Sequence, residues 1–205
     1  MSEENVVTYE LDGEIALVGL NRPDKRNCFN PDVMKALRVA IDRAGEEAKC
    51  GIIFGHGDNF CAGLDLRWAA ESWKTGRSER LPFQFNRNSY FEAMARGNIP
   101  FIAALHGATL GGGLEIALAC DVRYAAVGRA KLGTPEVTLG LLPGNGGTQR
   151  LPRLIGVGPA LELLATGRQL GADDALRLGL VSEVFEDAAA FDEHVARLAK
   201  LPPLA

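Results

Sequence analysis

Short apolar segments alternate along the chain with segments of helical periodicity, and this alternation restricts the possible folds more than any other feature. The apolar segments at 14–20, 51–54, 99–105 and 122–127 are rich in aliphatic residues, and glycine or other turn-forming residues follow each of them. Short runs of this kind are typical of buried strands. Strands that alternate with helices indicate an α/β protein.

The first helix is expected to begin immediately after residue 30. Asn30 is a favourable N-cap, Pro31 suits the first helical position, and Asp32 adds an acid to the first turn. The apolar residues that follow share one helical face, which predicts packing against a core; they are Val33, Leu37, Ile41 and Ala44.

The second half of the chain continues the pattern. We predict a helix at 114–120, a helical turn at 135–140 and a last strand at 181–186. The polar piece from Arg67 to Gly97 carries scattered aromatic residues and is consistent with either a surface helix or a lid. Three further helical stretches are separated by glycines, at 147–156, 158–167 and 172–181.

The composition is that of an ordinary globular protein, with glycine as the exception. Of 205 residues, 47% are hydrophobic and 23% are charged, which suits one domain with a sizeable core. Glycine occurs 24 times, above its usual share of about 7%, and this indicates many tight turns or close backbone approaches. The net charge of −4 argues against a nucleic-acid-binding surface.

The cysteines and the N-terminus indicate the cellular compartment of the protein. The four cysteines have neither CxxC spacing nor a nearby histidine cluster, so we expect reduced thiols rather than disulfides or a zinc site. The sequence has no window of 18 uncharged apolar residues, and its acidic N-terminus lacks the layout of a signal peptide. We therefore expect a cytoplasmic protein without a membrane span.

Several common catalytic motifs are absent from the sequence. There is no GxSxG nucleophile elbow and no GxxxxGK[ST] phosphate loop, and the glycines at 111–113 do not have GxGxxG spacing. The three histidines are widely separated, and each fits a turn or surface residue better than a metal ligand. The chemistry that remains available uses backbone amides and carboxylates.

The stretch HGATLGGGLEIALACD at 106–121 places three glycines and Glu115 at the start of an expected helix. The first amides of a helix have no partner within it and carry partial positive charge. Because glycine lets a ligand oxygen approach those amides, one interpretation is an oxyanion hole for a carbonyl that becomes negative during a reaction. The other is a glycine-rich turn before a structural helix, with Glu115 compensating the helix dipole.

Two further stretches have related features. FCAGLDL at 60–66 puts a glycine in a loop after a strand, which makes the amide of Leu64 available. PEVTLGLLPGNGGTQRL at 135–151 adds Glu136 at a helix start, where dipole compensation alone is worth about 0.3–1 kcal/mol. Two carboxylates in apolar sequence also match paired acid–base chemistry, because burial raises the pKa of a carboxyl group toward neutrality.

Together these segments resemble the crotonase, or enoyl-CoA hydratase/isomerase, superfamily from about Val6 to the end of the chain. Four motifs in order carry the resemblance: NRPDKRNCFN (21–30), FCAGLDL (60–66), HGATLGGGLEIALACDVRYA (106–125) and PEVTLGLLPGNGGTQRL (135–151). The resemblance implies a crotonase-type ββα spiral of two roughly perpendicular sheets flanked by helices, assembled as a homotrimer or hexamer. It also implies a spiral core at 1–187 and, at 188–205, the start of a C-terminal helical region that is shortened relative to the family.

The resemblance implies roles for four residues at matching positions. The backbone N–H groups of Leu64 and Gly112 form an oxyanion hole for a thioester carbonyl, and Glu115 and Glu136 match the two hydratase glutamates. The implied reaction is syn addition of water to the 2,3 double bond of an acyl-CoA, in which Glu115 deprotonates the water and Glu136 protonates the α-carbon. No metal or redox cofactor is expected, nor a nucleic-acid or membrane partner.

The same resemblance implies substrate contacts in three loops. The expected acyl-CoA contacts are Arg26, Asn27, Cys28, Ala62, Gly63, Leu64, Asp65, Leu66, Arg67, Gly111 and Gly112. Arg22, Lys25, Arg26 and Arg67 fit CoA phosphates and solvated surface charges equally well. Asp65 is expected to brace its loop rather than to act chemically. Structural roles in the turn behind Glu136 are expected for Gly144, Gly146 and Gly147.

Three functional hypotheses remain open from the sequence. The first is an enoyl-CoA hydratase. The second is another crotonase reaction, either double-bond isomerisation or the hydrolysis or carbon–carbon cleavage of a β-oxo substrate, because all of these share an enolate intermediate. The third is a non-catalytic, acyl-CoA-binding paralogue.

Overall fold

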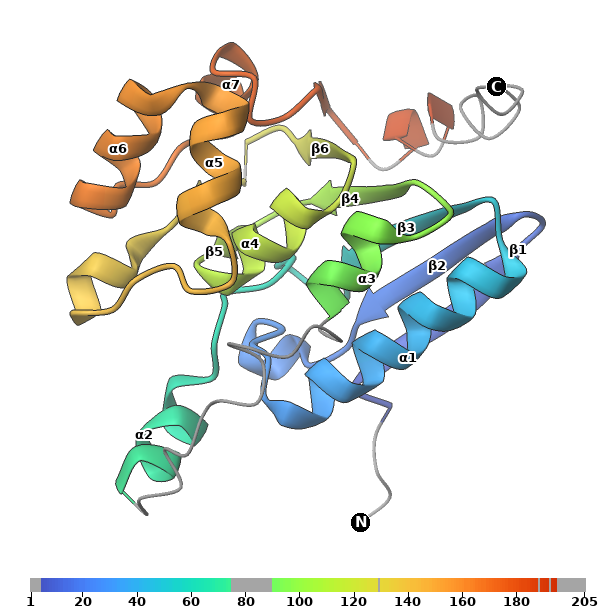
Figure 1. Ribbon diagram of the computed structural model, residues 1–205. Helices are drawn as coiled ribbons and strands as arrows, with labels where there is room; N and C mark the ends of the chain where they lie inside the picture. The colour runs from blue at the N-terminus through green and yellow to red at the C-terminus, as the bar shows by residue number, and fades with distance from the viewer. Residues whose placement is uncertain (1–4, 75–89, 129, 188, 192, 195–205) are drawn as a thin grey trace.

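A six-stranded sheet forms the centre of the part of the chain that the structure describes (Figure 1). The computed structural model describes residues 5–74, 90–128, 130–187, 189–191 and 193–194. β1 and β2 form an antiparallel hairpin, and the other neighbouring strands of this sheet are parallel. In their order across the sheet, the strands are β1 (Val7–Asp12), β2 (Ile15–Leu20), β3 (Cys50–Gly55), β4 (Phe101–Leu105), β6 (Val122–Ala126) and β8 (Glu183–Phe185).

Helices connect the parallel strands. α1 (Pro31–Glu47) leads from β2 to β3 and packs against β1 and β2. The Asn30 side chain caps it by accepting a hydrogen bond from the N–H of Val33 at 3.1 Å. The other helices are α2 (Leu66–Lys74), α3 (Tyr90–Arg96), α4 (Gly112–Ala119), α5 (Gly147–Ile155), α6 (Val157–Thr166) and α7 (Ala172–Arg177), with 3₁₀ helices η1 (Pro23–Lys25) and η2 (Pro135–Leu139).

A second, two-stranded sheet lies at the start of α4. Its strands, β5 (Ala108–Leu110) and β7 (Lys131–Gly133), are parallel. A single β-bridge joins Cys61 to Thr109 of β5, and another joins Phe29 to Leu64. These pairings bring the loops that precede α1, α2 and α4 side by side, although they are far apart in the sequence.

α4 is buried along its whole length, from Gly112 to Ala119. A helix that is apolar on all sides is stable only inside a core, and this helix has no polar face. Its end is held by Arg123, a buried residue of β6 whose guanidinium donates to the carbonyl of Cys120 at 2.7 Å and to that of Leu180 at 2.9 Å. The core therefore fixes both the position and the direction of α4.

The elements predicted from the sequence are largely confirmed. The four apolar segments form β2, β3, β4 and β6, and the helix predicted after residue 30 is α1. β1, β5 and β7 were not predicted from the sequence. The last two have only three residues each, too few for a periodic pattern.

The polar piece from Arg67 to Gly97 contains helices at both ends, α2 and α3. The expectation for its middle, at 75–89, lies outside the described residues. The division between residues 187 and 188 stays a prediction. Within the described ranges, we find no helix with the length and apolar character needed to cross a membrane.

Candidate active site

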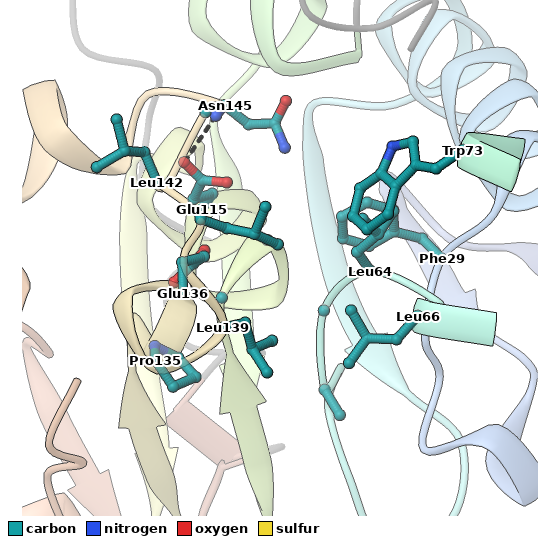
Figure 2. Close-up of a pocket in the computed structure, with 16 residues that line it drawn as sticks. Phe29, Leu64, Leu66, Trp73, Glu115, Pro135, Glu136, Leu139, Leu142 and Asn145 are labelled. Carbon is teal, nitrogen blue, oxygen red and sulfur yellow. Dashed lines mark hydrogen bonds between the residues drawn. The ribbon is translucent and has the colours of Figure 1, made fainter. Parts of the chain in front are cut away.

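A cavity of about 160 Å³ lies between η2, the start of α4 and the loop that leads into α2. Figure 2 shows Glu115 and Glu136 on one side of this cavity, with Leu64 and Trp73 on the other. The remaining lining residues are mostly apolar or glycine; they are Phe29, Ala62, Gly63, Leu66, Gly111, Gly112, Pro135, Leu139, Leu141, Leu142, Gly144 and Asn145. Two carboxylates thus face a recess with little other polar surface.

The glycines at the start of α4 allow close contacts on two sides. Gly111 has a φ of 53°, a left-handed conformation that favours glycine. A Cβ atom there would lie 3.1 Å from Oε1 of Glu136, so this carboxylate sits against the Gly111 backbone. A Cβ atom on Gly112 would lie 2.3 Å from the Phe29 ring. Both glycines are therefore required by the packing around the cavity.

Glu115, in the first turn of α4, is held by the loop that precedes α5. Its side chain is buried, and its Oε1 accepts hydrogen bonds from the N–H groups of Asn145 and Gly147, each at 2.8 Å. Burial raises the pKa of Glu115, whereas these two N–H groups, the Asn145 side chain and the charge of Arg150 act in the opposite direction. Oε1 is occupied, and Figure 2 shows the second oxygen directed toward the cavity.

Glu136, at the start of η2, has a different environment. Among the described residues its Oε2 is buried and has no hydrogen-bond partner. Burial, and secondarily the charge of Glu115, raise the pKa of Glu136 from 4.5 to about 7, although its own backbone N–H acts in the opposite direction. Glu136 is therefore the group of the pair that more readily keeps a proton near neutral pH.

The N–H groups of Leu64 and Gly112 are both available at the cavity. Both residues line it, and within the described parts of the chain neither N–H donates to a backbone acceptor. The neighbouring groups are satisfied: Phe29 donates to the Gly63 carbonyl, and Asp65 donates to the Phe29 carbonyl. In this strand-like pairing the N–H of Leu64 points away from Phe29. Gly112 is the first residue of α4, where a backbone N–H has no acceptor within the helix.

Internal hydrogen bonds shape the loop at 21–30. The buried Asn27 side chain donates to the carbonyls of His56 and Asn59 and accepts from the N–H of Arg22. Arg22 donates to the Cys28 carbonyl and forms an ion pair with Asp65 at 3.1 Å. The second oxygen of Asp65 accepts from the N–H of Trp68. Asn27 and Asp65 thus connect the loop that precedes α1 to the loop that precedes α2.

The predicted contact residues divide into two groups. Six of them line the cavity, namely Ala62, Gly63, Leu64, Leu66, Gly111 and Gly112, whereas Arg26, Asn27, Cys28, Asp65 and Arg67 do not. Arg26 and Arg67 are exposed, and Arg22 is engaged inside the protein. Among the described residues, including those around the three histidines, we find no group of side chains that could hold a metal ion.

Some of the residues that form the site were not predicted from the sequence. Asn145 was not singled out, although its N–H binds Glu115, and Gly147 was assigned only to shaping a turn. Leu139 and Leu142 line the cavity without having been named as contacts. The PGNGG turn before a helix was the available signal, because the first N–H groups of a helix lack internal partners and attract an anion.

Comparison with known proteins relates this geometry to one family. Residues 10–203 match the sequence profile described as Enoyl-CoA hydratase/isomerase. The short-chain-enoyl-CoA hydratase of Clostridium acetobutylicum is 40% identical over 187 residues, which cover 90% of this chain and 70% of that protein. The crotonyl-CoA hydratase of Syntrophomonas wolfei subsp. wolfei is 40% identical over 194 residues, covering 91% and 71%.

Solved structures agree with the sequence relatives. An enoyl-CoA hydratase from Thermoplasma volcanium superposes with a TM-score of 0.85 at 33% identity, covering 96% of this chain and 78% of that one. The predicted crotonase-type fold is confirmed. The fold, with its carboxylate pair beside glycine-rich loops, places the protein in the crotonase class. The chain belongs to the enoyl-CoA hydratase/isomerase family.

Proposed function

We propose that this protein is an enoyl-CoA hydratase, a lyase that adds water in the syn sense to the 2,3 double bond of an acyl-CoA. The observation that carries the proposal is the pair of glutamates on one side of the cavity with opposite environments. Glu115 receives two N–H donors, whereas Glu136 has a buried oxygen without a partner among the described residues. Relatives named as hydratases at 40% identity support the same activity.

The two environments assign the two proton transfers. The N–H donors favour an ionised Glu115. This carboxylate accepts a proton from the attacking water while the water oxygen bonds to the β-carbon. The raised pKa of Glu136, about 7, favours its protonated form, which gives its proton to the α-carbon. After one addition Glu115 holds a proton taken from the water and Glu136 has given its own proton to the α-carbon, so proton exchange with solvent returns both groups to their starting states.

The N–H groups of Leu64 and Gly112 complete the proposed chemistry. Addition at the β-carbon moves negative charge onto the thioester oxygen, and two fixed N–H donors stabilise that charge. The reaction needs neither a change in oxidation state nor a metal ion, because acid, base and oxyanion donors all come from the chain. The loops at 26–28 and 62–67 are proposed to contact the CoA part, and the apolar cavity walls to contact the acyl part.

The assembly and compartment are further parts of the proposal. We propose a homotrimer or a hexamer, supported by an apolar surface on η2, α5 and α6. On it Val157 and Leu161 are 70% and 63% exposed, and Leu142, in the loop between η2 and α5, is 80% exposed. A cytoplasmic location is supported by the four cysteines, which are all free. Nucleic-acid and membrane partners are not part of the proposed function.

The proposal is tested by measuring the hydration of crotonyl-CoA, which is monitored as the loss of the enone absorbance. Glu115→Gln and Glu136→Gln each remove one proton-transfer group, so we expect kcat to fall about 10²–10⁴-fold with a smaller change in KM. Glu162→Gln on α6, whose side chain is 54% exposed, is the control and is expected to retain activity. The proposal is wrong if no enoyl-CoA of any chain length reacts, or if both glutamate variants keep the wild-type kcat.

A further inference from the structure

Arg150 connects the first turn of α5 to the loop that holds Glu115. Its Nη1 donates to the carbonyl oxygen of Asn145 at 2.9 Å. Asn145 is also one of the two residues whose N–H groups bind Glu115. Arg150 is half-buried, and its guanidinium carbon lies 5.9 Å from the centre of the Phe91 ring on α3. The guanidinium is therefore placed by two neighbouring elements.

The geometry of three successive peptide groups explains what this contact does. The N–H of Asn145 and the N–H of Gly147 both donate to Oε1 of Glu115. The peptide group between those two donors carries the carbonyl of Asn145, and this carbonyl is the acceptor for Arg150. Rotation of this middle peptide would turn both neighbours, so a bond that fixes it also fixes the two donors of Oε1.

Gly146 makes room for the guanidinium. Its φ of 104° lies in the left-handed region, and a Cβ atom there would lie 2.1 Å from Nη1 of Arg150. Any other residue at this position would displace either the loop backbone or the arginine. The carbonyl of Gly146 in turn accepts from the N–H groups of Gln149 and Arg150, which begin α5. The glycine, the arginine and the start of the helix thus form one unit.

The charged and titratable groups around Glu115 come from three elements. Arg150 on α5 lowers its pKa, and Glu136 on η2 is the second carboxyl group. Burial raises the pKa of Tyr90 on α3 well above its usual value, so this hydroxyl stays neutral. β5, which also contacts α4, has no titratable residue. Among the described residues, Arg150 is the cation whose charge acts on Glu115.

We propose that Arg150 is a positioning residue, which fixes the Asn145–Gly146 peptide so that the flanking N–H groups hold Oε1 of Glu115 and leave its other oxygen to the substrate water. The inference rests on the proposed hydratase function for the role of that water. The holding of the carboxylate itself follows from the contacts alone and is measurable without turnover.

Arg150→Gln and Arg150→Lys test the inference, with Arg153→Gln as the control. Arg153 lies on the same helix, is exposed and donates hydrogen bonds to Gln149. The pKa of Glu115 is measured by ¹³C NMR on protein labelled at the glutamate carboxyl carbon, with Glu115→Gln to assign the signal. Hydratase kinetics are measured as a function of pH on the same samples, and circular dichroism establishes that each variant is folded.

We expect Arg150→Gln to raise the pKa of Glu115, because both the charge and the fixed donors are lost. The acid limb of kcat/KM moves to higher pH, and kcat falls about 10–100-fold with little change in KM. Arg150→Lys retains the positive charge and one donor group, so its Glu115 pKa and its kcat are expected to lie between those of wild type and Arg150→Gln. Arg153→Gln behaves as wild type.

Two results would overturn the inference. One is a folded Arg150→Gln variant whose Glu115 pKa and pH profile equal those of wild type. The other is an equal loss of activity in Arg150→Gln and Arg150→Lys with the Glu115 pKa unchanged, which indicates a role in stability alone. If the wild-type protein hydrates no enoyl-CoA, the proposed function fails, and the NMR titration still decides whether Arg150 positions the carboxylate.

Discussion

Glu115 and Glu136 are identical side chains that the fold places in unlike surroundings. Glu115 is the more deeply buried, yet two N–H donors and Arg150 compensate its negative charge. Glu136 is less buried, but among the described residues its Oε2 has no donor, and Glu115 adds a second negative charge nearby. Hydrogen-bond donors therefore distinguish the two carboxyl groups, and in the proposed function this difference makes Glu115 the base and Glu136 the acid.

The raised pKa of Glu136 predicts a cost to stability that depends on pH. Its pKa of about 7 in the folded protein lies above the ordinary value of 4.5, so between these values the folded state binds more protons than the unfolded state. The contribution of Glu136 to stability is complete below pH 4.5 and is lost as pH rises through 7. Because Gln does not titrate, Glu136→Gln is expected to raise Tm relative to wild type at pH 8, with a smaller gain at pH 5.5.

Thermal unfolding of wild type and variant at the two pH values measures this difference. Glu162→Gln is the control, since Glu162 is exposed and removal of its charge should not reproduce a gain that grows with pH. If the gain in Tm of Glu136→Gln at pH 8 does not exceed the gain at pH 5.5, the raised pKa of Glu136 is contradicted. Stabilisation together with loss of activity is the expected sign of a functional group that is kept at a cost to stability.

At the scale of elements, the site depends on how closely α4 approaches the loop at 60–66. A Cβ atom on Gly113 would lie 2.1 Å from the carbonyl oxygen of Cys61, which is backbone and cannot move aside as a side chain does. The same carbonyl accepts from the N–H of Leu110. The loop and the helix therefore meet backbone to backbone, and this contact sets the distance between Leu64 and Gly112 across the cavity.

Gly113→Ala is expected to separate α4 from this loop. Overpacking of this kind costs about 1–3 kcal/mol of unfolding free energy, and displacement of the proposed oxyanion donors is expected to lower kcat as well. Gly158→Ala is the matched control, because Gly158 lies in α6 and, apart from its chain neighbours and its own helix backbone, no atom lies within 4 Å of its Cβ position. A glycine within a helix costs about 0.5–1 kcal/mol relative to alanine, so this variant is not expected to be destabilised. Urea unfolding gives both values. A Gly113→Ala variant as stable as wild type would show that this contact can relax.

At the scale of the whole molecule, several exposed apolar side chains lie on three neighbouring elements. α6 packs against both η2 and α5, and the three elements present Val137, Leu139, Leu154, Val157 and Leu161 to solvent. Large contiguous apolar surfaces of soluble proteins usually mark an interface. Leu139 and Leu142 also line the cavity, so a second copy of the chain seated on this surface would lie beside the site.

This surface predicts an assembly in solution. Sedimentation equilibrium is expected to give three or six times the chain mass of 21.9 kDa. Val157→Glu and Leu161→Glu together place charge on the surface and are expected to shift the protein toward the single-chain mass. Val39→Glu on α1, where Val39 is 61% exposed, is the control and should leave the assembly unchanged. A wild-type protein that sediments as a single chain would exclude the proposed assembly.

Features that depend on neighbours in the sequence could be predicted before the structure was known. The start of α1 follows from Asn30 and Pro31, whose capping and backbone preferences are local. The buried strands follow from short apolar runs, and the glycines before Glu115 indicated a site that needs close backbone approach. The four motifs in order predicted the family, and the sequence profile and relatives confirm it.

Only the tertiary structure decided how these parts meet. Three contacts were not predicted. They are the pairing of Cys61 with Thr109, the hydrogen bonds from the Asn145 and Gly147 N–H groups to Glu115, and the contact of Arg150 with the loop that carries those N–H groups. Glu115 lies 30 residues before Asn145 in the chain, and no local preference links their conformations. Such contacts form because burial of α4 brings distant backbone groups together, and a buried carboxylate is stable only where donors meet it.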